Sequence, residues 1–228
     1  SEISRYLELD ALTVTGKSVD ENIANCSVKD REVIRSIDNP INSEGALAVL
    51  RGNIAPDGAL VKQSAVPPNL MQFRGPAKVY HSNETAIEAL RSGEIKAGDA
   101  VIIIFQGAKG GPGVVSTFPF TSELAGSELW DSVVLITDGR FSGATEGACI
   151  GYVSPEAALY GPILGIRNGD IVEYDIPSRK LDVELEPEVI EQRLKEAEVK
   201  IEIKRGYLGV YQSTVRSVLK GAVLSGRD

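Results

Sequence analysis

The chain has 228 residues, of which 43% are hydrophobic and 25% charged, and its net charge is −8. These values are typical of a globular protein with a sizeable core, and an acidic surface without basic runs argues against nucleic acid or an anionic membrane as a partner. No apolar run reaches the roughly 20 residues of a membrane helix, and the N-terminus lacks the basic and apolar regions of a signal peptide. We therefore expect a cytoplasmic protein that binds neither nucleic acid nor membrane.

The two cysteines, Cys26 and Cys149, do not form a C-x-x-C spacing, and His81 is the only histidine. Two cysteines build no disulfide framework, which is consistent with a reducing compartment. With one histidine they also cannot supply the ligands of a zinc or iron–sulfur site within a single chain. Both thiols are therefore expected to be buried and inert.

The first forty residues read as short helices and a connecting segment. A capping box, Ser18 with Glu21, predicts a helix over residues 18–24, and a shorter helix is expected before Leu12. Turn-forming residues and Pro40 lie between residues 37 and 45 and mark a boundary. We expect a helical segment and linker over residues 1–40 and a larger domain over residues 41–228.

The middle of the chain alternates strands and helices. Residues 46–62 predict a strand, a turn and a second strand, and Lys78–Tyr80 predict another. Ser82 or Asn83 is expected to cap the helix that follows, with Gly93 closing it. The further elements expected are buried strands over residues 101–105 and 133–137, a helix over 122–130, two strands within 160–185 with turns at 168–169 and 177–178, a helix over 186–198, and one tail helix ending near Gly221.

A glycine-rich loop, residues 106–117, directly follows the buried strand over residues 101–105. Such a loop exposes several backbone N–H groups and lets an anion or another backbone approach closely. The alternative is an ordinary flexible hairpin connection. The loop is not a phosphate-binding P-loop, because Lys109 precedes the glycines instead of closing the pattern.

A second glycine-bounded loop follows the strand over residues 133–137 and carries several polar side chains: Asp138, Arg140, Ser142, Thr145 and Glu146. A helix is expected to begin near Ser142, whose hydroxyl would then lie where free N–H groups stabilise a substrate carboxylate or a serine alkoxide. The alternative is that Ser142 or Thr145 simply caps that helix. His81 is expected at the surface, so a Ser-His-Asp hydrolase is disfavoured.

Five segments, taken together and in this order, resemble the C-terminal part of the dihydroxy-acid dehydratase / phosphogluconate dehydratase family: "LTVTGK" (12–17), "GNIAPDGALVK" (52–62), "GDAVIIIFQGAKGGPG" (98–113), "TDGRFSGATEG" (137–147) and "VSPEAALYGPI" (153–163). The resemblance covers nearly the whole chain. It implies an α/β fold, a swivelling β-barrel-like domain with flanking helices. It also implies a hydro-lyase that converts a 2,3-dihydroxy acid to an α-keto acid.

The resemblance also implies roles for particular residues. Ser142 would be the catalytic base, an alkoxide that takes the proton at C2 of the substrate, because an unassisted hydroxyl is too weak a base. Gly143, Thr145 and Arg140 would bind the substrate. Members of the family use an iron–sulfur cluster, which acts as Lewis acid on the C3 hydroxyl, and a magnesium ion.

The family's cluster cysteines lie in an N-terminal domain, so this chain alone is expected to hold no cofactor. The resemblance therefore implies a cluster-binding N-terminal domain or subunit as partner, and a homodimer. The substrate is a small dihydroxy acid. "SGATEG" and "KGAV" favour a branched-chain precursor, whereas "RGYLGVY" leans towards a sugar acid.

Two positions depart from the family pattern. Ser116 stands where the family usually carries a metal-binding glutamate, and Gln106 stands where a glutamate is common. A hydroxyl is a much poorer magnesium ligand than a carboxylate, so this metal position is expected to be lost. These departures keep open a different class of function, a non-catalytic module that binds a small acid or regulates.

Overall fold

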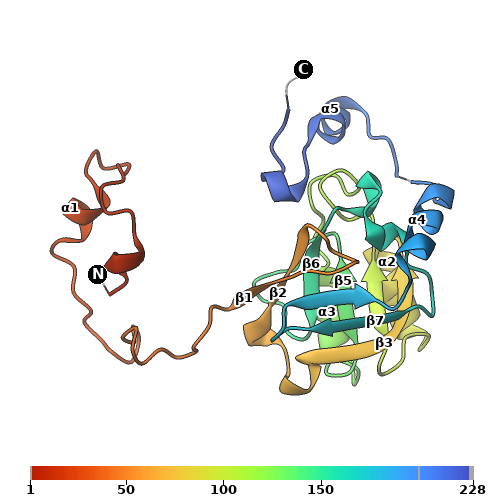
Figure 1. The fold of residues 1–228 in the computed structure, drawn as a ribbon, viewed down its shortest axis with the longest axis horizontal. Coiled ribbons are helices and arrows are strands. Elements are labelled where there is room, and N and C mark those ends of the chain that lie inside the picture. The colour runs from red at the N-terminus through yellow and green to blue at the C-terminus, as the bar shows by residue number, and fades with distance from the viewer. Residues whose placement is uncertain (1, 200, 226–228) are drawn as a thin grey trace. The chain divides into compact units, whose positions relative to one another are not determined.

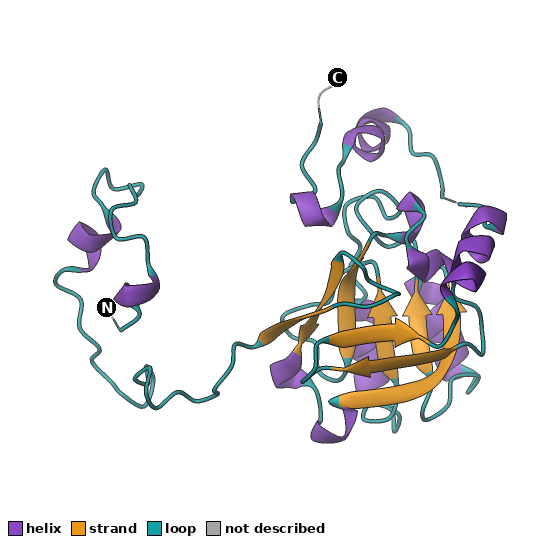
Figure 2. Cartoon of the chain, in the orientation of Figure 1, coloured by secondary structure: helices purple, strands orange, loops and turns teal. Residues whose placement is uncertain are grey.

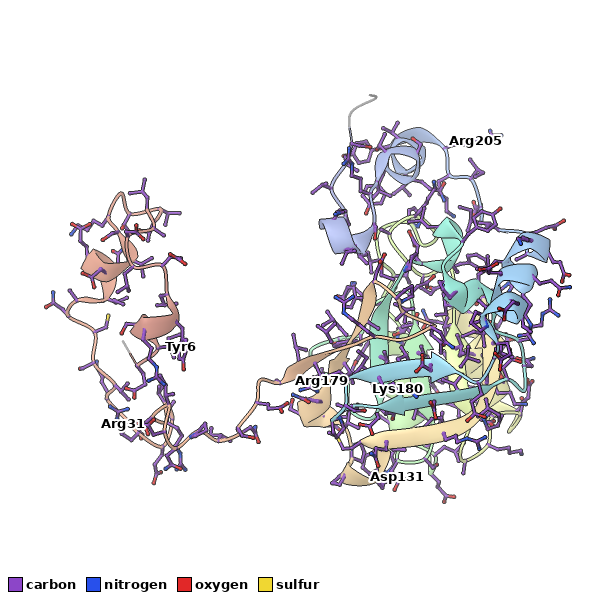
Figure 3. The ribbon with its side chains drawn as sticks, viewed as in Figure 1. Tyr6, Arg31, Asp131, Arg179, Lys180 and Arg205 are labelled. Carbon is purple, nitrogen blue, oxygen red and sulfur yellow. The ribbon has the colours of Figure 1, made fainter. Side chains whose placement is uncertain are left out.

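The structure is a computed structural model that describes residues 2–199 and 201–225. It divides into two compact units, Ser1–Gly45 and Ala46–Asp228. The first unit contains η1 (Ser4–Tyr6) and α1 (Val19–Ile23). The predicted capping box is confirmed, because the Ser18 hydroxyl accepts the Glu21 N–H and the Glu21 carboxylate accepts the Ser18 N–H at 2.8 Å. Arg31, labelled with Tyr6 in Figure 3, pairs with Glu2 at 2.8 Å.

The second unit is built on one eight-stranded sheet in the order β1-β2-β6-β5-β4-β3-β7-β8 (Figure 1). The strands β3, β4, β5 and β6 are parallel, and the remaining neighbours are antiparallel. Their bounds are β1 Leu47–Leu50, β2 Gly58–Lys62, β3 Gln72–Tyr80, β4 Ala100–Ile103, β5 Val134–Thr137, β6 Cys149–Ser154, β7 Ile171–Asp175 and β8 Lys180–Val183.

The sheet curves until its two edges meet, which makes it a nearly closed barrel (Figure 2). The residue after β1, Arg51, forms a parallel bridge with Lys180 of β8. Its N–H donates to the Arg179 carbonyl and its carbonyl accepts the Leu181 N–H, both at 2.9 Å. Asn53 extends the closure, because its side-chain amide donates to and accepts from the backbone of Val183, each at 2.8 Å. The closure therefore rests on residues 51–53, which follow β1 and lie beside β8.

The central parallel strands β4 and β5 are buried on both faces, as their continuous apolar sequences predict. In β4, Ile102 packs in the barrel interior, whereas Val101 and Ile103 face outward against α2 (Asn83–Arg91) and α3 (Phe118–Ala125). The remaining helices are α4 (Pro187–Glu196) and α5 (Gly206–Thr214), with 3-10 turns η2 (Gln63–Ala65), η3 (Pro68–Leu70), η4 (Ala157–Leu159), η5 (Pro162–Gly165) and η6 (Val218–Lys220). The expected α/β barrel-like fold with flanking helices is therefore confirmed.

Three expectations about local structure are wrong. No helix begins near Ser142; a turn over residues 142–145 leads instead into β6, where Cys149–Ser154 satisfy their backbone groups in the sheet. The helix expected over residues 122–130 lies earlier, because Pro119 fits its first turn and Gly126 ends it. The tail is two pieces, since Val215 is extended after α5 and only η6 follows before Gly221.

Candidate functional site

Parallel pairing brings the ends of four strands to one edge of the barrel, since parallel strands point the same way. His81 follows β3, Gln106 follows β4, Asp138 follows β5 and Glu156 follows β6. Loops at the carboxyl ends of parallel strands are a common place for binding sites. His81 is exposed, as expected, and its ring packs edge-on against Phe105.

Asp138 is the fully buried anchor of this edge, with no solvent exposure. Its carboxylate accepts the backbone N–H groups of Phe105 at 3.2 Å, Gln106 at 2.8 Å and Ala157 at 2.9 Å. Burial raises the pKa of Asp138 to about 7, and the nearby Glu156 also raises it, whereas the three N–H donors pull it down. One carboxylate thus fixes the chain leaving β4 and the chain leaving β6.

Glu156 holds the first glycine loop in the same manner. Its carboxylate is buried and accepts the N–H groups of Lys109 at 2.9 Å and Gly110 at 3.3 Å. Burial is the main reason that the pKa of Glu156 is raised. The loop therefore folds around a carboxylate of its own chain, and its N–H groups at Lys109 and Gly110 are already engaged.

A backbone bridge joins the two glycine loops. Ser116 and Arg140 pair in parallel, with the Arg140 N–H donating to the Val115 carbonyl at 3.0 Å and the Thr117 N–H to the Arg140 carbonyl at 2.8 Å. The Arg140 guanidinium is exposed and its Nε donates to the Val114 carbonyl at 3.0 Å. The bridge places the two glycine loops side by side.

Ser142, Gly143 and Thr145 share one tight turn. The Ser142 N–H donates to Thr145 Oγ1 and the Thr145 N–H donates to the Ser142 carbonyl, both at 3.0 Å. Ser142 is half-buried, and its hydroxyl oxygen accepts the Ala144 N–H at 3.2 Å. Thr145 is 4% exposed and so anchors the turn, while Gly143 is exposed. Ser142 thus receives a backbone donor without a helix N-terminus.

Lys62, at the end of β2, contacts this turn directly. Its Nζ donates to the Gly143 carbonyl at 2.6 Å. Just beyond it, the Ala65 carbonyl accepts the Gly147 N–H at 3.0 Å. The loop that carries Ser142 is therefore held against the end of β2 by one side chain and one backbone bond.

A cavity of about 550 Å³ lies beside Leu60, two residues before Lys62 on β2. Since alternate strand residues share a face, Leu60 and Lys62 point to the same side of the sheet. Apolar side chains make up most of the cavity wall, among them Val49, Leu60, Val114, Val218 and Leu219. Tyr152 and the exposed Arg51 add polar groups to it.

Three residues near these loops have a left-handed backbone: Phe105 with φ 62°, Val114 with φ 58° and Tyr152 with φ 56°. This conformation is strained for a residue with a side chain, and most of all for a β-branched valine. Strain of this kind gathers at functional sites. Val114 and Tyr152 line the cavity, and Phe105 directly precedes the first glycine loop. The strained residues therefore indicate a functional site at this edge of the barrel.

The residues considered as metal ligands have other partners. Ser116 Oγ accepts the Phe118 N–H at 3.3 Å, and the Gln106 amide donates to the carbonyls of His81 at 3.1 Å and Ile104 at 3.2 Å. Within residues 2–199 and 201–225, no three histidine, cysteine, aspartate or glutamate side chains gather to hold a metal ion. The side chains present therefore do not fit an iron–sulfur cluster or a complete magnesium site.

The two cysteines differ in environment. Cys149 is buried, and burial raises its pKa to about 12, which keeps the thiol protonated. Cys26 is exposed, so the expectation that both thiols are buried is wrong for this one. Cys26 lies in the N-terminal unit, where residues 2–45 include no buried side chain.

Residues 32–222 match the family model described as dihydroxy-acid/6-phosphogluconate dehydratase C-terminal. The chain belongs to this family. It is 55% identical over 222 residues to a dihydroxy-acid dehydratase of Acetivibrio thermocellus, covering 97% of the chain and 40% of that relative. It is 52% identical to one of Caldicellulosiruptor saccharolyticus and 51% identical to one of Clostridium botulinum, each alignment covering 98% of the chain and 41% of the relative. The chain thus spans about two fifths of the length of the curated relatives that it matches.

For a dehydratase C-terminal domain, sequence reasoning missed three residues that organise the site. Lys62 lies within the quoted "GNIAPDGALVK" motif, and Glu156 within "VSPEAALYGPI", but no motif indicated what they contact. Gln212 is 4% exposed and its amide donates to the Lys109 carbonyl at 3.1 Å. The sequence shows only a polar residue directly after the run "GYLGVY", which does not indicate a contact. Among the described residues, no helix is both long enough and apolar enough to cross a bilayer.

Proposed function

We propose that this chain is the C-terminal part of a hydro-lyase that dehydrates a 2,3-dihydroxy acid to an α-keto acid, with Ser142 as the base. The observation that carries the proposal is the Ser142 hydroxyl oxygen, held in a closed turn and accepting the Ala144 N–H at 3.2 Å. A preorganised N–H donor stabilises negative charge on an oxygen, which a serine needs if it is to act as a base. Membership of the dehydratase family supplies the reaction.

In this reaction Ser142 removes the proton at C2 and hydroxide leaves from C3, which gives an enol. The enol takes up a proton at C3 and loses the proton of its C2 hydroxyl to become the α-keto acid, so the net change is loss of water. We assign Gly143, Thr145 and Arg140 to the substrate side of the site. Thr145 holds the turn from within, and the exposed Arg140 guanidinium is the cation nearest in sequence to Ser142.

The cavity beside Leu60 favours a branched-chain acid over a sugar acid as substrate. Its walls are mainly aliphatic, and a polyhydroxylated chain placed there would lose hydrogen bonds to water without replacing them. A short branched alkyl group instead gains from leaving water. Arg51, Tyr152 and Ser154 offer polar groups to a carboxylate or hydroxyl in the same cavity, and Asp57 also lines it.

We place the iron–sulfur cluster and the magnesium ion in the part of the enzyme that lies outside this chain. The cluster would act as the Lewis acid for the departing hydroxyl. We further propose that residues 41–228 form the swivelling domain, that residues 1–40 link it to an N-terminal cluster-binding domain or subunit, and that the complete enzyme is a cytoplasmic homodimer. The relatives' additional length is consistent with such a domain.

A second candidate is a small-acid-binding or regulatory module without turnover. It is favoured by Ser116 and Gln106, which make backbone contacts at the family's metal-binding loop in place of carboxylates. Under this alternative the domain would bind the acid in the same cavity and would not turn it over.

The test is a dehydratase assay on this chain assembled with a cluster-loaded N-terminal half, with magnesium and with dihydroxyisovalerate or gluconate. Turnover of dihydroxyisovalerate that Ser142→Ala abolishes and that Ser122→Ala leaves intact would support the proposal. Ser122 is the matched control because it is an exposed serine on α3, away from the turn. A folded, associated mixture that binds the acid without turnover would favour the second candidate.

A further inference from the structure

Lys62, the last residue of β2, makes a side-chain contact that the pairing of the strand does not require. Val61 is fully buried in the barrel, so strand alternation turns Lys62 outward. There its Nζ reaches the Gly143 carbonyl at 2.6 Å, joining residues 81 positions apart. Gly143 directly follows Ser142, so the ammonium lies against the peptide group next to the proposed base.

Lys62 makes no ion pair with a carboxylate within the described residues. Its positive charge is therefore not balanced by a carboxylate and acts on the turn. A cation close to a hydroxyl favours the deprotonated form, because the two opposite charges attract.

The turn is held from outside as well as from within. Its internal hydrogen bonds join Ser142 to Thr145 and the Ala144 N–H to the Ser142 hydroxyl. Gly143 is exposed and has no heavy atom within 4 Å of the position that a Cβ would take. A glycine with this freedom would let the peptide group between Gly143 and Ala144 rotate. The Lys62 ammonium limits this rotation because it binds the Gly143 carbonyl.

We propose that Lys62 is a positioning residue for Ser142. By holding the Gly143 carbonyl it keeps the Ala144 N–H directed at the Ser142 oxygen, and its charge favours the alkoxide. This inference rests on the proposed function, in which Ser142 is the base. It goes beyond that proposal because it assigns part of the activation of Ser142 to a residue of a different strand.

The test compares Lys62→Met, Lys62→Gln and Lys62→Arg in the complete enzyme, assembled from this chain and its cluster-loaded N-terminal half. Removing the charge and the hydrogen bond in Lys62→Met should lower kcat on the order of tenfold or more, with KM changed by less than about threefold. Lys62→Arg should keep most of kcat. Lys62→Gln keeps a donor without the charge, so its kcat should fall between those of Lys62→Met and Lys62→Arg. The control is Lys78→Met, which removes a half-buried lysine of β3.

Wild-type kcat in Lys62→Met would overturn the inference, and rescue by Gln equal to that by Arg would overturn the role of the charge. If Lys62→Met does not fold, as judged by thermal melting, the comparison of Gln with Arg still decides. Ser142→Ala separates the two proposals: full activity in that variant removes Ser142 as the base. An inactive Ser142→Ala beside an unaffected Lys62→Met removes only the role of Lys62.

Discussion

Glu156 occupies the space that a side chain on Gly107 would need. A Cβ built on Gly107 would lie 1.7 Å from Glu156 Oε2 and 2.9 Å from the Glu156 Cβ. The carboxylate cannot easily move away, because it is buried and bound to the N–H groups of Lys109 and Gly110. The absence of a side chain at Gly107 is thus the condition for the loop to fold around Glu156.

Gly107→Ala should therefore destabilise the domain by about 2–3 kcal/mol, since the new methyl group must displace a buried, hydrogen-bonded carboxylate. Urea unfolding followed by circular dichroism measures this loss. The control is Gly143→Ala, because no heavy atom lies within 4 Å of the Cβ position there. Equal stability of the two alanine variants would show that the loop does not depend on the Glu156 contact.

Asp138 should make the stability of the domain depend on pH. Its pKa is raised from 3.8 to about 7 in the folded protein, mainly by burial, so the folded state binds the proton more tightly than the unfolded chain. The stabilising contribution is complete below pH 4 and is lost as the pH rises through about 7. Glu156, whose pKa is also raised, adds to the same trend.

Asp138→Asn should therefore flatten the pH dependence of the free energy of unfolding between about pH 4 and 7. The variant should also be less stable at low pH by about 1–3 kcal/mol, because its NH₂ group cannot accept the Gln106 N–H. Urea titrations at a series of pH values test both statements. A slope as steep as that of the wild type would assign the pH dependence to other groups. Asp175→Asn is the contrasting variant, since the Ser178 N–H lowers the pKa of that exposed carboxylate.

The parallel strands could be predicted from the sequence, whereas the closure of the barrel could not. Continuous apolar runs such as Val101–Ile104 indicate strands covered on both faces, and each runs into a loop with the glycines and polar residues of a site. Closure instead depends on pairing Arg51 with Lys180, and no local pattern specifies which residues meet across so long a stretch of chain.

The turn at Ser142 illustrates a different limit of sequence reasoning. The stretch after Ser142 satisfies a helix-start pattern, but the same residues are drawn into the sheet because Ile150 pairs with both β2 and β5. Tertiary pairing therefore overrides the local preference. The role of Lys62 depends on that same pairing register, so a sequence pattern alone could not have placed it beside Gly143.

Gln212 should hold α5 in place over the first glycine loop. Its Nε2 donates to the carbonyls of Lys109 and Glu202, each at 3.1 Å, and its Oε1 accepts the Lys204 N–H at 3.1 Å. Gln212 is also the one buried residue within α5. Gln212→Ala should cost about 1–3 kcal/mol and speed hydrogen exchange in residues 206–214, because three backbone groups lose their partner.

The control for this variant is Gln192→Ala, which removes an exposed glutamine of α4 whose amide contacts only Glu196. Hydrogen exchange read by mass spectrometry distinguishes local from global loosening. Faster exchange in residues 206–214 with unchanged protection of β4 and β5 would support a local anchor. Unchanged exchange in α5 would mean that the helix is held by other contacts.

Leu219 should help to set the choice of substrate. It lies in η6, it is 53% exposed, and its side chain lines the cavity opposite β1 and β2 residues such as Val49 and Leu60. Replacing it with serine removes an apolar wall and adds a hydroxyl that can bond to a polar substrate. In the complete enzyme, Leu219→Ser should lower kcat/KM for dihydroxyisovalerate by about tenfold, the scale of a lost apolar contact in a binding pocket.

For gluconate the same variant should keep or raise kcat/KM, so the ratio of the two values is the quantity that decides. Leu208→Ser is the matched control, because Leu208 is 51% exposed on α5 and does not line the cavity. If both serine variants change the ratio equally, the effect comes from the tail as a whole. If neither changes it, the cavity does not hold the alkyl part of the substrate, and specificity must come from the region around Arg140 or from the N-terminal half.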